Sequence, residues 1–304
     1  MPHDHAHHHP DPDALAGDRR VGVAVAVNIL LTVVQIIAGV VSGSLALVAD
    51  AIHNLSDALS LVIAFWARKL ARRPADASMT FGYGRAEVVA AMVNYTTLIV
   101  IALYLAAQGI ERLFNPVEIE GWIVVVVAAV ALVIDSVTAL LIMRLSSESM
   151  NMRAAFLHNI ADAMGSVAVI IGGTLILLYD WRLIDPIITL MISGYILWHS
   201  WLGIRPVISV LMLATPDDGP PLEELITAMQ AIDGVADIHH VHHFRMAEHE
   251  AALEAHILIE DEADPLRVKN DLKSLLQSRF ALRHSVLEFE TRADACTAPQ
   301  RIGH

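Results

Sequence analysis

The segment HNLSDA at residues 53–58 returns almost unchanged as HNIADA at residues 158–163. Each copy lies in a long apolar stretch and places a His and an Asp four residues apart. Because four residues make about one helical turn, the two side chains of each copy share one helix face. Ionisable groups at membrane depth are costly, so they usually face a bundle interior and mark an ion path. The repeat therefore predicts one metal site shared by two membrane helices. Its ligands would be His53, Asp57, His158 and Asp162.

The remaining sequence supplies the other helices of such a bundle. The chain has 304 residues, is 55% hydrophobic and has a mean hydropathy of +0.54, which is too apolar for an ordinary soluble domain. Six segments approach the ~20 apolar residues that cross a ~30 Å hydrocarbon core. They are 21–43, 45–67, 86–113, 121–143, 154–179 and 184–204. We predict a six-helix transmembrane domain over residues 21–213, and a retained first helix rather than a cleaved signal peptide.

The N-terminal residues 1–20 contain five His among Pro and Asp, a composition that cannot build a core. We expect this His-rich tail to be disordered. It is either a loose arm that collects metal or a soluble tail without a role in transport.

Basic residues indicate how the helices are oriented. If the N-terminus is cytoplasmic, only Arg112 and Arg182 fall on the outer side. The inner side then receives Arg19, Arg20, Arg68, Lys69, Arg72, Arg73, Arg85, Arg144, Arg153 and Arg205. Because cytoplasmic loops of membrane proteins carry an excess of Lys and Arg, both termini are predicted to be cytoplasmic. We expect an integral protein of the bacterial inner membrane.

The four candidate ligands suit the exchange of a metal for protons. In the predicted topology the second and fifth helices run in opposite directions, so the two pairs interleave as a tetrahedron, the geometry that zinc prefers. Two ionised Asp give the empty site two negative charges, which one divalent cation cancels. Without metal that charge is costly in low dielectric, so protons take its place. Metal and protons therefore compete for the same groups, which is the chemical basis of an antiporter. The alternative is two unrelated polar pairs that are hydrogen-bonded within a bundle.

Two further acids lie in the predicted helices. Asp50 stands one turn before His53 and is expected either to support that ligand or to lie at the membrane interface. Asp135, in the fourth helix, is a proton relay, an additional metal oxygen or a packing partner of nearby hydroxyls.

The C-terminal part has a different character. After a break at TPDDGPP (residues 215–221) the pattern predicts a helix at 221–232, strands at 235–246 and 251–260, a helix at 266–280 and a strand at 285–291. This α-β-β-α-β order suits a small cytoplasmic two-layer α+β domain over residues 214–291, followed by a C-terminal tail at 292–304. Residues 214–304 hold 8 basic and 17 acidic side chains, a net charge of −9, which argues against a nucleic-acid partner. The single cysteine, Cys296, excludes an intramolecular disulfide and a Cys-rich zinc finger.

His residues gather on the strands predicted for this domain. Strand alternation places His240 and His242 on one face, and His239 and His243 on the other. One sheet would then gather His242, His256, His284 and either Glu288 or Glu290. Either the domain holds one or two regulatory metal sites or it carries a His-rich solvated sheet edge. The candidate ligands are His240, His242, His256, His284 and Glu290.

Over residues 15–291 the sequence resembles the cation diffusion facilitator family, in its zinc-type subgroup of zinc, cobalt and cadmium exporters. The resemblance rests on six stretches: SLALVADAIHNLSDALSL, FGYGRAEVVAAMVN, MNMRAAFLHNIADAMGSVAVI, DPIITLMISGYIL, GVADIHHVHHFRM and EAHILIE.

This resemblance implies a homodimer that exports divalent metal, above all Zn²⁺, from the cytoplasm in exchange for protons. It implies alternating access around a fixed site and a ferredoxin-like C-terminal domain that dimerises and whose bound metal biases transport. The sequence departs from many members at Asp135 and lacks a His-rich link between the fourth and fifth helices.

Two other classes of function fit the sequence less well than the exporter. An intramembrane zinc hydrolase would use three ligands and keep one position open for water, whereas the repeat offers four. A haem-binding electron carrier would use His53 and His158 as axial ligands, beside which two Asp are poor neighbours. We therefore predict a transporter and not an enzyme, with divalent metal, protons, membrane lipid and a second copy of the chain as partners and no nucleic acid.

Overall fold

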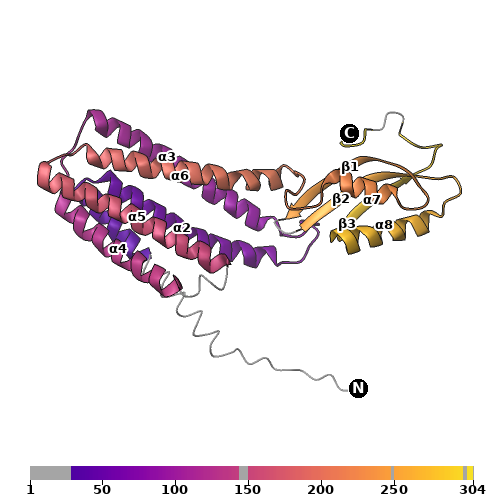
Figure 1. The fold of residues 1–304 in the computed structure, drawn as a ribbon, viewed down its shortest axis with the longest axis horizontal. Coiled ribbons are helices and arrows are strands. Elements are labelled where there is room, and N and C mark those ends of the chain that lie inside the picture. Colours follow the sequence, from indigo (N-terminus) through magenta and orange to yellow (C-terminus); the bar gives the residue numbers. More distant parts are fainter. Residues whose placement is uncertain (1–28, 144–149, 248–249, 297–299, 304) are drawn as a thin grey trace, which may run out of the picture. The chain divides into compact units, whose positions relative to one another are not determined.

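The computed structural model describes residues 29–143, 150–247, 250–296 and 300–303 (Figure 1). The predicted tail at 1–20 lies outside these residues, as do the side chains of Asp57 and His158. The chain divides into two compact units. The helical unit comprises residues 1–63 and 94–201, and the sheet unit comprises residues 64–93 and 202–304.

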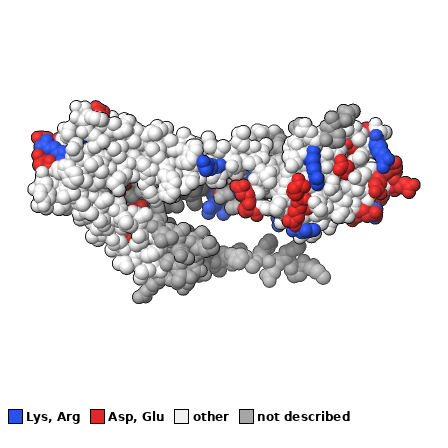
Figure 2. All heavy atoms as spheres, turned by 45° about the horizontal axis from the view of Figure 1, so that its top comes forward, with Lys and Arg blue, Asp and Glu red and all other residues white. Residues whose placement is uncertain are grey.

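Long apolar helices form the transmembrane domain. After a helical segment at 29–42 come α2 (Leu45–Ala71), α3 (Ala86–Phe114), α4 (Gly121–Met143), α5 (Met150–Tyr179) and α6 (Ile184–Leu211). Within the described residues, α3, α4, α5 and α6 are long and apolar enough to cross a membrane, while 29–42 and 45–56 are shorter apolar stretches. Figure 2 shows the sides of the long helices almost free of charged side chains. Apolar residues such as Val100, Val133 and Leu178 are at least 60% exposed there, as lipid-facing positions require.

The start of α2 is held by a carboxylate from α6. Asp185, which is only 2% exposed, accepts hydrogen bonds from the backbone N–H groups of Leu45 (2.9 Å) and Ala46 (3.2 Å) and from the Ser44 hydroxyl. The first N–H groups of a helix have no partner within it and favour negative charge. Asp185 therefore fixes the N-terminus of α2 against α6.

Glycines let α5 approach its neighbours closely. A Cβ at Gly173 would come within 2.9 Å of Val125 on α4, and one at Gly121 within 2.9 Å of the Gly173 carbonyl oxygen. A Cβ at Gly172 would lie 2.5 Å from Ile188 on α6. The absence of side chains at these glycines therefore permits the close packing of α5 against α4 and α6. In Figure 1, α4 lies beside α5 along much of its length.

The sheet unit contains the α-β-β-α-β order that the sequence predicts. Its elements are α7 (Leu222–Gln230), β1 (Val235–Ala247), β2 (Glu250–Ile259), α8 (Pro265–Phe280) and β3 (His284–Glu290). In the sheet order β1-β2-β3, β2 pairs antiparallel with β1 and parallel with β3. Leu253, Ala255 and Ile257 of β2 belong to the same core as α7 and α8, so the alternate residues Glu254 and His256 lie on the opposite face.

A β-bulge interrupts β1 and changes which His side chains share a face. His239 pairs with His256, but the next registered pair is His242 with Glu254, so two β1 residues stand opposite Ala255. His240 has a φ of +48°, the left-handed region. Because of this extra residue, His239 and His242 lie on the same sheet face, and the strict alternation predicted for these four His is wrong.

The C-terminal segment accepts hydrogen bonds from the backbone N–H groups of the bulge. The N–H of His240 donates to the Gln300 carbonyl (2.9 Å), and the N–H of Val241 donates to the Arg301 carbonyl (3.2 Å). A bridge between Val241 and Ile302 continues this pairing. Residues 300–302, which the sequence assigned to a tail, are therefore docked against β1.

Candidate metal sites

The helical unit brings together one residue from each copy of the repeated motif. His53 on α2 and Asp162 on α5 approach to 3.5 Å between Nε2 and Oδ1, and their side chains are 16% and 10% exposed. The structure thus joins the two copies through one His and one Asp. The other two predicted ligands, Asp57 and His158, lie on the same helices, but their side chains are outside the described part of the chain.

Gln35, which the repeat did not identify, is hydrogen-bonded to Asp50, the acid that precedes His53 by one helical turn. Gln35 is fully buried, and its amide nitrogen donates to Asp50 Oδ2 (2.9 Å) while its oxygen accepts from Asn54 (3.5 Å). A Cβ at Gly165 of α5 would come within 3.0 Å of Asp50 Oδ1, so this glycine leaves room for the carboxylate. Asp50 is buried inside the bundle, with 4% of its surface exposed, and its carboxylate accepts the hydrogen bond from Gln35. The sequence signal that could have identified Gln35 is the presence of a glutamine inside an apolar segment.

Two further residues lie near these groups. The ring of Tyr195 meets His53 edge-on, with 6.0 Å between the ring centroids, and stacks on His199 at 6.1 Å. Asp135 of α4 is buried, at 6% exposure. Tyr195 and Asp135 therefore lie in the same helix bundle as the His53–Asp162 pair.

The sheet unit contains a second cluster of potential ligands. His239, His240, His256 and Cys296 each offer one ligand atom, and these atoms all lie within 4.8 Å of one another. The His240 and His256 rings are 4.8 Å apart at their centroids, and His239 lies 5.6 Å from His256. The sequence pattern predicted His240 and His256 as ligands but not His239 and Cys296. His239 was assigned to the wrong face because of the bulge, and Cys296 was assigned to a tail.

Glu290 supports this cluster from β3. Its Oε1 lies 2.5 Å from His256 Nδ1, and its Oε2 accepts from the Cys296 backbone N–H (3.1 Å). Burial raises the pKa of Glu290, but the hydrogen bonds from His256 and Cys296 outweigh burial, and the pKa is lowered overall. The Cys296 thiol also donates to Glu290 Oε1 (3.3 Å), and this hydrogen bond raises the pKa of the thiol. Glu290 is therefore an ionised carboxylate that orients two members of the cluster.

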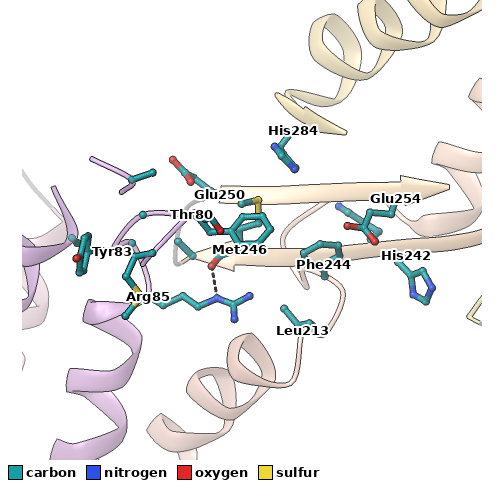
Figure 3. Close-up of a pocket in the computed structure, with 18 of the residues that line it drawn as sticks. Thr80, Tyr83, Arg85, Leu213, His242, Phe244, Met246, Glu250, Glu254 and His284 are labelled. Atoms are coloured by element: carbon teal, nitrogen blue, oxygen red, sulfur yellow. Dashed lines mark hydrogen bonds between the residues drawn. The ribbon is translucent and has the colours of Figure 1, made fainter. Parts of the chain in front are cut away.

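The other two predicted cytoplasmic ligands lie apart from this cluster. His242 pairs with Glu254, and His284 pairs with Ala252, two residues away along β2. Both His line a pocket of about 1240 Å³ within the sheet unit, together with Glu254 and residues of the 73–87 loop (Figure 3). The expectation that His242 and His284 would join His256 is not met among the described residues, because the register separates them along the strands.

Comparison with known proteins places these features in a family. Residues 21–212 match the family model described as the cation efflux transmembrane domain. The chain is 32% identical over 287 residues to the metal cation efflux system protein CzcD of Cupriavidus metallidurans, covering 94% of this chain and 89% of that one. It is 30% identical to the zinc transporter ZitB of Escherichia coli, covering 95% and 93%.

A mouse protein and a solved structure are also similar. The proton-coupled zinc antiporter SLC30A2 of Mus musculus is 28% identical over 96% of this chain and 84% of its own. The solved metal-bound C-terminal domain of the CzcD transporter is 26% identical, with a TM-score of 0.23, over 23% of this chain and 99% of that one.

Proposed function

The chain belongs to the cation efflux family, and from that premise we propose that it is a proton-coupled antiporter that exports Zn²⁺, with Co²⁺ and Cd²⁺ as further substrates. It is an integral membrane protein and a transporter rather than an enzyme. The names of ZitB and SLC30A2 support zinc, and a Bacillus subtilis relative, 30% identical and named as a cadmium, cobalt and zinc antiporter, supports the other two metals. The name of SLC30A2 as a proton-coupled antiporter supports the coupling. An intramembrane zinc hydrolase is not favoured.

The observation that carries this proposal is the approach of His53 to Asp162 across two helices. We infer that the transport site comprises His53, Asp57, His158 and Asp162. Two imidazoles and two carboxylates suit a tetrahedral divalent ion. The same groups are protonated when the metal leaves, since an empty charged site in low dielectric is costly. Each transport cycle would therefore exchange metal for protons.

The wider architecture of the proposal follows the family. It comprises six transmembrane helices over residues 21–213, with both termini in the cytoplasm of a bacterium, and a ferredoxin-like cytoplasmic domain over residues 214–291. Two copies form a homodimer, and the helices rock around the site to open it to either side. Helices long and apolar enough to cross a bilayer, and a sheet with both parallel and antiparallel pairs, support this arrangement.

Metal bound in the sheet unit would regulate transport. His240 and His256, with Glu290 beside them, are the predicted cytoplasmic ligands that the structure gathers in one place. His242 and His284 lie outside this cluster and line the pocket of Figure 3. There Arg85 Nε donates to the Met246 carbonyl (2.8 Å), so the loop between α2 and α3 contacts the β-hairpin within the sheet unit. Through this contact, a change in the hairpin would reach the ends of two helices.

Zn²⁺ binding to the full-length protein in detergent tests the transport site. We expect Asp162→Asn to bind one Zn²⁺ fewer per chain, and calorimetry in buffers of different ionisation enthalpy to show fewer protons released. Asp180→Asn is the matched control, because Asp180 is an exposed carboxylate paired with Arg182 outside the bundle. Unchanged zinc stoichiometry and proton release in Asp162→Asn would remove Asp162 from the site.

A further inference from the structure

We propose that the single cysteine of this chain is a metal ligand. In this proposal the Cys296 thiolate completes a site with His239, His240 and His256, which binds a thiophilic divalent cation such as Zn²⁺, Cd²⁺ or Co²⁺. The inference rests on the proposed function in one respect, that metal in the cytoplasm reaches the sheet unit. It adds a sulfur ligand, Cys296, to the imidazole and carboxylate groups already proposed for the sheet unit.

The distances between the four groups are close to those of a metal site. Cys296 Sγ lies 3.9 Å from His240 Nδ1 and 3.8 Å from His256 Nδ1. Zinc binds nitrogen at about 2.1 Å and sulfur at about 2.3 Å, so neighbouring ligand atoms of a tetrahedron are about 3.5 Å apart. Since all four ligand atoms lie within 4.8 Å of one another, side-chain adjustments of about an ångström would close the site around an ion.

His239 gives an independent indication of a ligand at this position. Its side chain is buried, with 3% of its surface exposed, and neither ring nitrogen forms a hydrogen bond within the described residues. Both nitrogens face carboxylates without a hydrogen bond: Nε2 lies 3.2 Å from Glu290 Oε2, and Nδ1 lies 3.7 Å from Asp237 Oδ2. A buried imidazole without hydrogen bonds costs free energy. A metal ion bound to one of its nitrogens would remove that cost.

The backbone holds Cys296 at the cluster from both sides. On one side, Glu290 accepts from the Cys296 N–H; on the other, Gln300 and Arg301 pair with the bulge at His240 and Val241. Glu290 Oε1 also lies 2.5 Å from His256 Nδ1, the same ring nitrogen that faces the Cys296 sulfur. Glu290 is thus a positioning residue, and its carboxylate orients both His256 and Cys296.

Sulfur changes which metals this site prefers. Thiolate ligands favour soft and borderline ions such as Cd²⁺ and Zn²⁺, whereas Mg²⁺ and Mn²⁺ favour oxygen. The site would therefore respond to the ions that the transporter is proposed to export and stay indifferent to the abundant hard cations of the cytoplasm.

Absorption spectroscopy of the full-length protein with Co²⁺ tests this proposal directly. A thiolate bound to Co²⁺ gives a near-ultraviolet charge-transfer band that nitrogen and oxygen ligands do not give. Because the chain has one Cys, any such band from the reduced, purified protein reports Cys296 alone. We expect the band to grow to saturation on Co²⁺ titration, to be absent in Cys296→Ser and to be weakened in His239→Gln. His284→Gln is the matched control, because His284 is outside the cluster, and it should retain the full band.

The outcomes separate this proposal from the proposed transport function. A wild-type protein that is saturated with Co²⁺ without the band would overturn the sulfur ligand. A band that His239→Gln and a corresponding His256→Gln leave unchanged would overturn the ligand set. Asp162→Asn should keep the band whatever its transport, because Asp162 lies in the other unit. Failure of zinc export therefore leaves the test of Cys296 intact.

Discussion

At the scale of single residues, Asp185 carries a larger structural role than its position in the sequence indicates. It accepts from three donors at the start of α2, and Arg112 lies 3.9 Å from its Oδ2. We predict that Asp185→Ala destabilises the protein by about 3 kcal/mol, because buried N–H groups lose their acceptor. Thermal unfolding in detergent should show a clearly lower midpoint.

Asp180→Ala is the control for that experiment. Asp180 is an exposed carboxylate paired with Arg182 at 2.8 Å, so its removal should leave the midpoint nearly unchanged. Equal midpoints for the two variants would show that the helix start does not depend on Asp185.

The residues of the membrane site were easier to predict than those of the sheet unit. The repeated HxxxD spacing identified His53 and Asp162, because helical periodicity decides which side chains share a face. Gln35 is absent from the repeat and was missed, although it is hydrogen-bonded to Asp50. His239 and Cys296 were missed because their contact depends on a bulge and on a distant segment of the chain.

At the scale of elements, close contact between α4 and α5 depends on the absence of a side chain at Gly173. Gly173→Val should force these helices apart, because its Cβ would press on Val124, Val125 and the Gly121 carbonyl. We predict a loss of about 1–3 kcal/mol, the usual cost of overpacking. Gly194→Val is the matched control: it has the same change in helix propensity, but no heavy atom lies within 4 Å of the added Cβ in the described chain.

The lower thermal midpoint is expected only for Gly173→Val. If both glycine variants unfold at the wild-type temperature, α4 and α5 do not need the close approach seen here. If both are destabilised equally, the effect comes from the valine in the helix and not from helix packing.

Most helix and strand boundaries followed from local pattern. In the sheet unit each predicted element begins and ends within about two residues of the observed one, since apolar periodicity, the break before α7 and Asp264 as an N-cap are local signals. The helix ends at Ala71 and Leu211 extend past the predictions, because each helix continues through the polar or Pro positions that bounded its predicted apolar segment, Arg68–Lys69 in α2 and Arg205–Pro206 in α6. The bulge at His240 had no local signal, since non-glycine residues in general rarely adopt a positive φ and the partner of its N–H lies 60 residues away.

At the scale of the whole molecule, the sequence was sufficient for the family and the class of function. Long matching stretches and the repeated motif predicted a cation efflux protein, and the family model and relatives confirm it. Four of the six predicted spans are long and apolar enough among the described residues, whereas the first two apolar stretches are shorter there. The helix α2 as a whole runs for 27 residues, Leu45–Ala71, and carries His53 within it.

The proposed antiport requires that metal and protons exchange at the site shared by α2 and α5. Its most direct test is Zn²⁺ flux in proteoliposomes with an imposed pH gradient, comparing wild type with His53→Ala/Asp162→Ala and with Asp180→Asn. We predict that wild type and Asp180→Asn move Zn²⁺ in the direction opposite to the proton flow. We predict that the double variant, shown by size-exclusion chromatography to be folded, has lost this flux. Gradient-driven Zn²⁺ flux at the wild-type rate in the double variant would show that metal and protons do not exchange at His53 and Asp162.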